Sequence, residues 1–193
     1  MPEPLTLLIG LGNPTAHYAT HRHNIGAMLL AQIAEKYNFP RWQNKFKGLW
    51  SAGTLGDTPV GLLFPQTYMN LSGESVLAAV QFFKTPLENI WVLHDDLDVP
   101  LGKIKIKQGG GHGGHNGLRS IDALVGQNYH RLRLGISHPG HKDLVTPHVL
   151  SPFHKDEWET VERVLSGVTE NMSLLLTGKT GTFLGKQCYN PQT

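Results

Sequence analysis

Four polar segments of this 193-residue chain carry side chains that could do acid–base chemistry or bind a ligand. They combine histidine, aspartate and asparagine with many glycines. A histidine beside a carboxylate can take a proton from water near neutral pH, and asparagine offers a donor and an acceptor that do not titrate. The segments cover residues 10–24, 65–73, 94–98 and 109–117.

Three common kinds of site do not fit these segments. Gly10-x-Gly12 lacks the third glycine of a dinucleotide fingerprint, because Thr15 holds that place. The glycine-rich loop at 109–117 has no Gly-Lys-Ser/Thr and is not a P-loop, although it could form a mobile lid. No serine lies in a Gly-x-Ser-x-Gly elbow, and Ser72 has the position of a helix cap.

A metal site is a further alternative. His94, Asp95, His112 and His115 could bind metal ions in a phosphoesterase. Metal ligands need rigid support, however, and we expect histidines among so many glycines to be poorly held. We therefore expect no metal and no cofactor. Composition alone cannot choose a general base among the eleven histidines.

Apolar runs alternate with helical patterns along the chain, which predicts one α/β domain spanning residues 1–193 on a largely parallel or mixed sheet. Because ligands bind beyond the carboxyl ends of the strands in such sheets, the polar segments have the expected positions. The patterns predict strands at residues 5–9, 60–64, 90–93, 103–107 and 131–137, and helices within 25–33, 76–83, 121–125 and 158–176.

Basic residues are concentrated between residues 103 and 133, where one acid, Asp122, accompanies six cations. In the strands KIKIK (103–107) and RLRL (131–134), alternation sends the cations to one face. If the two strands are neighbours, their cations form a patch that suits a phosphate-bearing partner such as a nucleic acid.

The remaining features indicate a protein of the cytoplasm. No apolar stretch approaches the length needed to span a bilayer, and the first residues fit neither a signal nor a transit peptide. The single cysteine, Cys188, excludes an internal disulfide. We expect a monomer, since no segment has the pattern of a zipper or an apolar interface helix.

Taken together, the polar segments resemble the bacterial-type peptidyl-tRNA hydrolase family. The matching blocks are GLGNP…Y…HRHNIG, FPQTYMNLSG, HDDLDVPLGKIKIKQGGGHGGHNGLRSI and RLRLGISHPG, in the family's order over about two thirds of the chain. The resemblance implies a compact α/β sandwich with a mixed, twisted central sheet flanked by helices. It also implies hydrolysis of the ester that joins a peptide to the 3′ end of tRNA. A non-catalytic RNA-binding relative is the other alternative.

The resemblance also implies roles for single residues. His23 matches the catalytic histidine, Asp95 the aspartate that supports its basicity, and Asn13 a position that helps to discriminate peptidyl-tRNA from aminoacyl-tRNA. The positions that match substrate binding are Tyr18, Tyr68, Met69, Asn70 and Asn116, and those that match tRNA phosphate binding are Lys105, Lys107 and Arg133.

Two residues depart from the family pattern. Thr15 stands where the family commonly has glycine, which a turn accepts if it needs no positive φ. His21 stands where threonine is common and places a second imidazole near His23. His21 is therefore the alternative base, although the Arg-His-Asn register favours His23.

Overall fold

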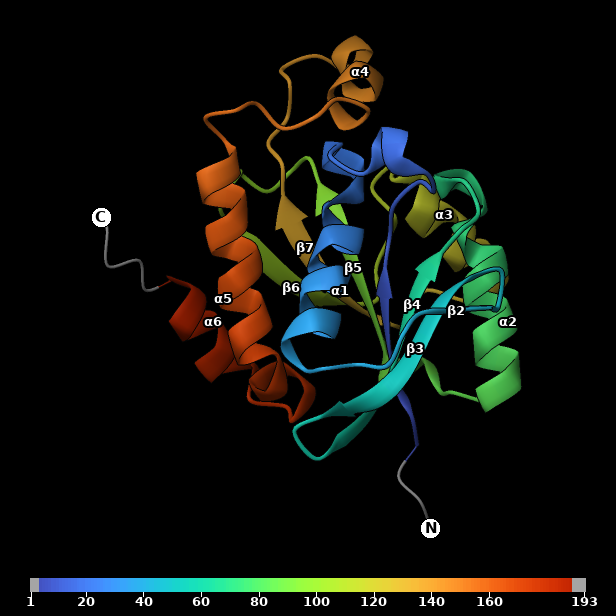
Figure 1. Cartoon of the computed structure of the whole chain (residues 1–193). Helices are drawn as coiled ribbons and strands as arrows, with labels where there is room; N and C mark the ends of the chain where they lie inside the picture. The colour runs from blue at the N-terminus through green and yellow to red at the C-terminus, as the bar shows by residue number, and fades with distance from the viewer. Residues whose placement is uncertain (1–3, 189–193) are drawn as a thin grey trace.

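The computed structural model describes residues 4–188 and contains one seven-stranded sheet between layers of helices (Figure 1). This arrangement confirms the predicted α/β fold. The strands are β1 (Thr6–Gly10), β2 (Gln43–Lys45), β3 (Gly48–Leu55), β4 (Thr58–Pro65), β5 (Ile90–Asp96), β6 (Ile104–Gln108) and β7 (His130–Gly135).

The sheet is mixed, with the order β2-β3-β4-β1-β5-β7-β6. Four central strands run parallel, since β1 pairs with β4 and β5, and β5 pairs with β7. The outer pairs β2 with β3, β3 with β4, and β6 with β7 are antiparallel. The carboxyl ends of the four parallel strands therefore meet at one edge of the sheet, which is the upper edge in Figure 1.

Helices cover both faces of the sheet. The first apolar cluster packs α1, α5 and α6 on one face, and the second packs α2 and α3 on the other (Figure 1). Residues Leu7, Leu8 and Ile9 of the central strand β1 are fully buried because both faces are covered. The helices are α1 (Ile25–Lys36), α2 (Ser72–Phe83), α3 (Asn116–Leu124), α4 (Val145–Val149), α5 (Trp158–Leu176) and α6 (Thr180–Cys188).

Short 3-10 helices begin where strands end at the carboxyl edge. The helices η1 (Ala16–Tyr18) and η2 (Arg22–Asn24) follow β1, and η3 (Met69–Leu71) follows β4. They hold the polar segments close to the ends of the strands. None of the helices in the described part of the chain is long and apolar enough to cross a membrane.

The structure confirms all five predicted strands and the helix at 158–176, and it adds elements that the sequence did not predict. β2, β3, α4 and α6 were not expected, and α3 begins at Asn116, five residues before the predicted range. β3 depends on a tertiary contact: the ring of Trp50 lies over Gly61 of β4, where a Cβ atom would meet it at 2.0 Å.

Candidate functional site

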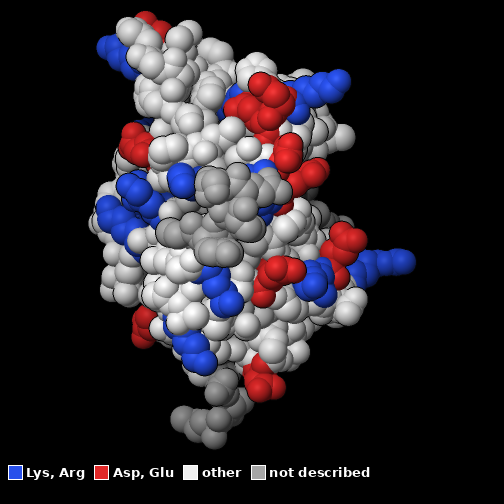
Figure 2. Space-filling view, turned by 90° about the vertical axis from the view of Figure 1, so that its left-hand side faces the viewer, with Lys and Arg blue, Asp and Glu red and all other residues white. Residues whose placement is uncertain are grey.

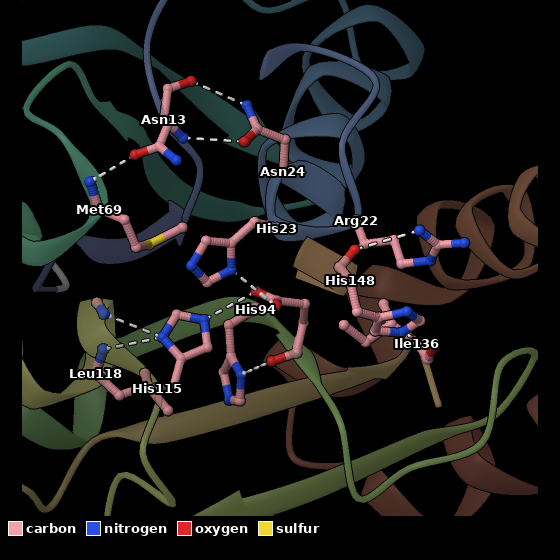
Figure 3. Close-up of polar contacts among 12 residues, drawn as sticks. Asn13, Arg22, His23, Asn24, Met69, His94, His115, Leu118, Ile136 and His148 are labelled. Atoms are coloured by element: carbon pink, nitrogen blue, oxygen red, sulfur yellow. Dashed lines mark hydrogen bonds and ion pairs between the residues drawn. The ribbon is translucent and has the colours of Figure 1, made fainter. Parts of the chain in front are cut away.

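His23 and Asp95 lie at the carboxyl edge of the sheet and are hydrogen-bonded. His23 belongs to η2, while Asp95 lies near the end of β5. Nδ1 of His23 is 2.8 Å from Oδ2 of Asp95, and only 8% of His23 and 3% of Asp95 is exposed (Figure 3). Both residues line a cavity of about 580 Å³. The sequence-based pairing of these two residues therefore has the geometry that a base and its orienting carboxylate need.

His115 binds the second oxygen of the same carboxylate. Its Nε2 atom is 2.8 Å from Oδ1 of Asp95. Its Nδ1 atom accepts hydrogen bonds from the backbone N–H groups of Gly117 and Leu118, so His115 is the N-cap of α3 (Figure 3). Because Nδ1 accepts, the proton of the neutral ring lies on Nε2 and is donated to Asp95.

Asp95 is an ionised carboxylate that accepts hydrogen bonds from the imidazoles of His23 and His115. Burial raises its pKa, but the charges and hydrogen bonds of His23 and His115 outweigh burial and hold the pKa of Asp95 well below its usual range. For His23, burial lowers the pKa, and the charge and hydrogen bond of Asp95 outweigh it, so the pKa of His23 is raised. An ionised Asp95 requires a donor at Nδ1 of His23, which leaves Nε2 as the basic nitrogen of the neutral ring.

His94 supports the backbone of this cluster and does not take part as an acid or base at neutral pH. Its Nδ1–H donates to the carbonyl oxygen of Asp95 at 2.8 Å. Burial, followed by the neighbouring charge of His115, lowers the pKa of His94 to about 4. His94 is therefore neutral at pH 7.

The arrangement fits a hydrogen-bond network better than a metal site. Among the described residues, ligand atoms of His23, Asp95 and His115 lie within 4.8 Å of one another. His115 could ligate a metal through Nε2 only with a lone pair there, and this would put a proton on Nδ1 against the N–H groups of α3. The alternative metal set of His94, Asp95, His112 and His115 does not assemble among the described residues, since the group of ligand atoms within 4.8 Å includes neither His94 nor His112, and His112 bonds locally to the N–H of Gly114.

One expectation about the glycine-rich loop was wrong. His115 is not poorly held: its side chain is 9% exposed and both of its ring nitrogens are bonded. Met69 and Leu11 pack over Gly117, where a Cβ atom would meet the Met69 sulfur at 2.7 Å and the His115 ring at 3.0 Å. The positioning role of His115 was not predicted, because the helix was expected at residues 121–125 while α3 begins at Asn116, directly after His115.

His21 does not compete with His23 for Asp95. It is 6% exposed, and its Nδ1 atom is buried without a partner among the described residues. Burial, and then the charges of His17 and His23, lower the pKa of His21. Its ring instead makes edge contacts with His17 and Tyr18 at centroid distances of 5.4 Å. Within residues 4–188, no carboxylate is bonded to His21 as Asp95 is bonded to His23.

Asn13 is held beside η3 in one fixed orientation. Its Oδ1 atom accepts from the backbone N–H of Met69 at 2.7 Å, so the amide cannot be reversed without losing this bond. Asn24 fixes the Asn13 backbone through bonds of 3.0 Å and 2.9 Å (Figure 3). The Nδ2 group of Asn13 has no partner in the described part of the chain and remains available as a donor.

The structure places the predicted substrate residues in two adjoining groups. Tyr18 and Tyr68 lie near each other, with ring centroids 6.3 Å apart, and Tyr68 is 54% exposed. Met69 is buried beside them, and Asn70 follows in η3 with an exposed side chain. The other group lines the cavity and contains His23, Asp95, Lys107, Asn116 and Arg133.

The predicted adjacency of the basic strands is confirmed, since β6 and β7 pair with Lys105 opposite Arg133 and Lys107 opposite Arg131. Arg133 donates from Nε to Asp96 at 2.8 Å and lines the cavity. Figure 2, which views the side of α5 and α6, shows Lys and Arg gathered along one margin and mixed charges elsewhere.

Arg131 does not belong to the accessible cations that the alternating pattern suggested. It is 2% exposed, and its guanidinium donates to the carbonyl oxygens of Gly110 and Gly111 and to Asp122. Arg131 therefore fastens the glycine-rich loop to β7.

Thr15 has a backbone conformation that favours glycine. Its φ is 80° and its ψ is 152°, a region that residues with a Cβ atom rarely adopt. The condition under which threonine would be harmless, a turn without positive φ, is therefore not met. The strain lies two residues from Asn13.

Comparison with known proteins agrees with the fold and shows the family. The family model for peptidyl-tRNA hydrolase matches residues 7–190. The peptidyl-tRNA hydrolase of Cereibacter sphaeroides is 50% identical over 179 residues, which cover 93% of this chain and 80% of that protein. The one from Rhodopseudomonas palustris is 47% identical over 182 residues, with 94% and 90% covered.

A solved structure agrees closely as well. The crystal structure of peptidyl-tRNA hydrolase from Acinetobacter baumannii superposes with a TM-score of 0.91 at 40% identity and covers 97% of each chain. The chain therefore belongs to the peptidyl-tRNA hydrolase family.

Proposed function

We propose that this protein hydrolyses the ester between a peptide and the 3′ end of tRNA, with His23 as the general base and without a metal ion. The observation that carries this proposal is the bond from Nδ1 of His23 to the ionised Asp95. This bond directs the basic Nε2 atom of His23 away from Asp95, and His23 lines the cavity. Family membership supplies the class of substrate.

In the proposed reaction, Nε2 of His23 removes a proton from a water molecule as the water oxygen attacks the ester carbonyl. Asp95 stabilises the imidazolium that forms, and His115 holds the second carboxylate oxygen in place. The bond from the carbonyl carbon to the ribose oxygen then breaks, and the ribose oxygen keeps the electron pair and takes the proton from the His23 imidazolium. The ribose leaves as a hydroxyl, and neutral His23 is regenerated. No covalent intermediate with the protein is required.

Asparagine side chains would bind the peptide and select the substrate. The free Nδ2 donor of Asn13 is fixed by the bond between Oδ1 and Met69, which suits recognition of a peptide carbonyl. Asn70 and Asn116 would hold the peptide backbone and the attacking water, beside Tyr18 and Tyr68. Lys105, Lys107 and Arg133 would bind tRNA phosphates.

The cellular setting belongs to the same proposal. A substrate released during translation places the enzyme in the cytoplasm, where it would recycle tRNA. We propose that the protein acts as a monomer, because the sequence has no pattern of a zipper or of an apolar interface helix.

The test is single-turnover hydrolysis of an N-acetylated aminoacyl-tRNA by the wild type and by His23→Ala. A general base contributes about 10²–10⁴ in rate, so His23→Ala should lose that much turnover while its KM stays close to wild type. His21→Ala is the matched control and should retain turnover. Near-normal turnover in His23→Ala, or loss of wild-type activity in a chelator, would contradict the proposed mechanism. If the wild type bound the substrate without any turnover, the proposal that this protein is an enzyme would be wrong.

A further inference from the structure

Arg22 is a buried cation that the proposed mechanism does not use. It directly precedes His23 in η2, and its side chain is 4% exposed. The two neighbouring side chains diverge: His23 is hydrogen-bonded to Asp95, while Arg22 extends toward His148 (Figure 3). A buried guanidinium without partners would be strongly unfavourable, so its contacts indicate what it holds.

The guanidinium of Arg22 joins two segments that are distant in sequence. Nη2 donates to Oε1 of Glu157 at 2.8 Å, and Nη1 donates to the carbonyl oxygen of His148 at 3.2 Å. Its Cζ atom lies 5.5 Å from the centre of the Phe153 ring. Glu157 is the N-cap residue of α5, and His148 lies in α4. One side chain therefore ties η2 to both helices.

Backbone contacts run beside this side chain. The backbone N–H of Arg22 donates to the carbonyl oxygen of Ser151 at 3.0 Å, and the backbone N–H of Phe153 donates to the carbonyl oxygen of Thr20 at 3.3 Å. His21 and Pro152 form an isolated bridge. Residues 151–153, which precede α5, therefore pair with residues 20–22, which directly precede His23.

The segment held in this way forms one wall of the cavity. Val145, Thr146 and Val149 of α4 line the cavity that His23 and Asp95 also line. The outer attachment of α4 is made by His148, whose Nε2 atom lies 2.9 Å from the carbonyl oxygen of Ser137. On the inner side, Arg22 provides the side-chain link between this wall and η2.

We infer that Arg22 is a positioning residue, which fixes α4 relative to His23 and so sets the width of the cavity that receives the substrate. This inference rests on the proposed function. Lysine cannot replace arginine here, because an ammonium group cannot reach Glu157 and His148 with the geometry of the planar fork.

Steady-state kinetics of Arg22→Lys and Glu157→Gln test the inference. Arg22→Lys should raise KM for N-acetylated aminoacyl-tRNA about tenfold and change kcat less than about threefold, because the wall moves while the base stays bound to Asp95. The acid limb of the pH profile should not shift. Glu157→Gln, a milder change that keeps an acceptor, should raise KM in the same direction.

Hydrogen exchange provides a readout that does not depend on activity. The backbone amides of residues 142–149 should exchange faster in Arg22→Lys than in the wild type. The control is Lys47→Gln, which removes the exposed 3.7 Å ion pair with Glu74 of α2 and should alter neither exchange nor KM.

The outcomes separate the inference from the proposed function. A lower melting temperature with unchanged KM and unchanged exchange would overturn the inference, and so would a fall in kcat with a shifted acid limb. An inactive wild type would overturn the proposed function instead, while the exchange rates would still report on Arg22.

Discussion

The protonation state of His23 depends on a single carboxylate. Asp95 raises the pKa of His23 against the opposing effect of burial. In the proposed mechanism the neutral ring is the base, so kcat/KM should fall as the pH drops through a pKa above the ordinary value of about 6.5. This sign follows because protonation of Nε2 removes the lone pair that accepts the proton from water.

Asp95→Asn should move the acid limb of the pH profile to lower pH. Without the charge, burial becomes the main influence on His23 and lowers its pKa. The maximal rate should also fall, on the order of 10²–10⁴, because the asparagine can donate to Nδ1 and leave Nε2 protonated. Rate profiles between pH 5 and pH 9 would measure both effects, with the exposed Asp98→Asn as the control. An acid limb that stays in place would show that another group titrates.

His115 joins Asp95 to the start of α3, and two substitutions separate its proposed support of Asp95 from its role as a helix cap. Asparagine can cap α3 but is too short to reach Asp95, whereas alanine can do neither. His115→Asn and His115→Ala should therefore lose kcat by the same factor, about tenfold for a loss of about 1.4 kcal/mol. Urea unfolding should find the asparagine variant more stable than the alanine variant by about 1 kcal/mol. Different losses of kcat would argue against the link to Asp95.

Among the elements, the turn after β1 contains strain that can be removed. Thr15 has a positive φ, and such a conformation costs about 1–3 kcal/mol in a residue with a Cβ atom. Thr15→Gly should stabilise the protein by about 1 kcal/mol, because glycine relieves the strain but also gains freedom in the unfolded chain. Urea unfolding would measure the gain. Thr15→Ala, which keeps a Cβ atom, should not show it; equal stability of the two variants would mean that the strain is relieved elsewhere.

The elements that sequence patterns predicted are those that carry their own apolar periodicity. The strands around Leu8, Leu62 and Leu93 have continuous apolar runs because both faces of the sheet are covered. By contrast, β3 has the small and polar sequence GLWSAGTL and depends on Trp50 packing over Gly61. Such a contact between strands cannot be read from either strand alone.

Some parts of the site could be predicted from the sequence and others could not, because only some of them depend on patterns within a single segment. The polar segments after β1, β4 and β5 lie together because parallel strands end at one edge, which the sequence pattern already implied. The bond from His115 to Asp95 depends on where α3 starts relative to β5, and the helix start is hidden because histidine is an unusual cap and Gly117 disfavours a helix. The burial of Arg131 likewise depends on the path of the glycine-rich loop.

Over the whole molecule, charge is placed unevenly although its total is only +2. The paired strands β6 and β7 bring Lys105 and Arg133 opposite each other at one end of the sheet. Acidic side chains are interspersed with basic ones over much of the face shown in Figure 2. A phosphate-bearing partner would therefore be attracted to the edge that carries the cavity, and not to the surface as a whole.

The salt dependence of KM should report this basic edge. Each phosphate contact contributes about 0.7–0.9 to the slope of log affinity against log salt, so Lys105→Ala should flatten the slope by about 0.8 and the double variant with Arg133→Ala by about 1.5. KM should rise with less change in kcat, because phosphate contacts bind the substrate equally in its ground and transition states. The matched control is the double variant Lys36→Ala and Arg41→Ala, which removes the same charge from two exposed positions, the last residue of α1 and a residue that follows it. If the two double variants flatten the slope equally, general charge and not this edge attracts the tRNA.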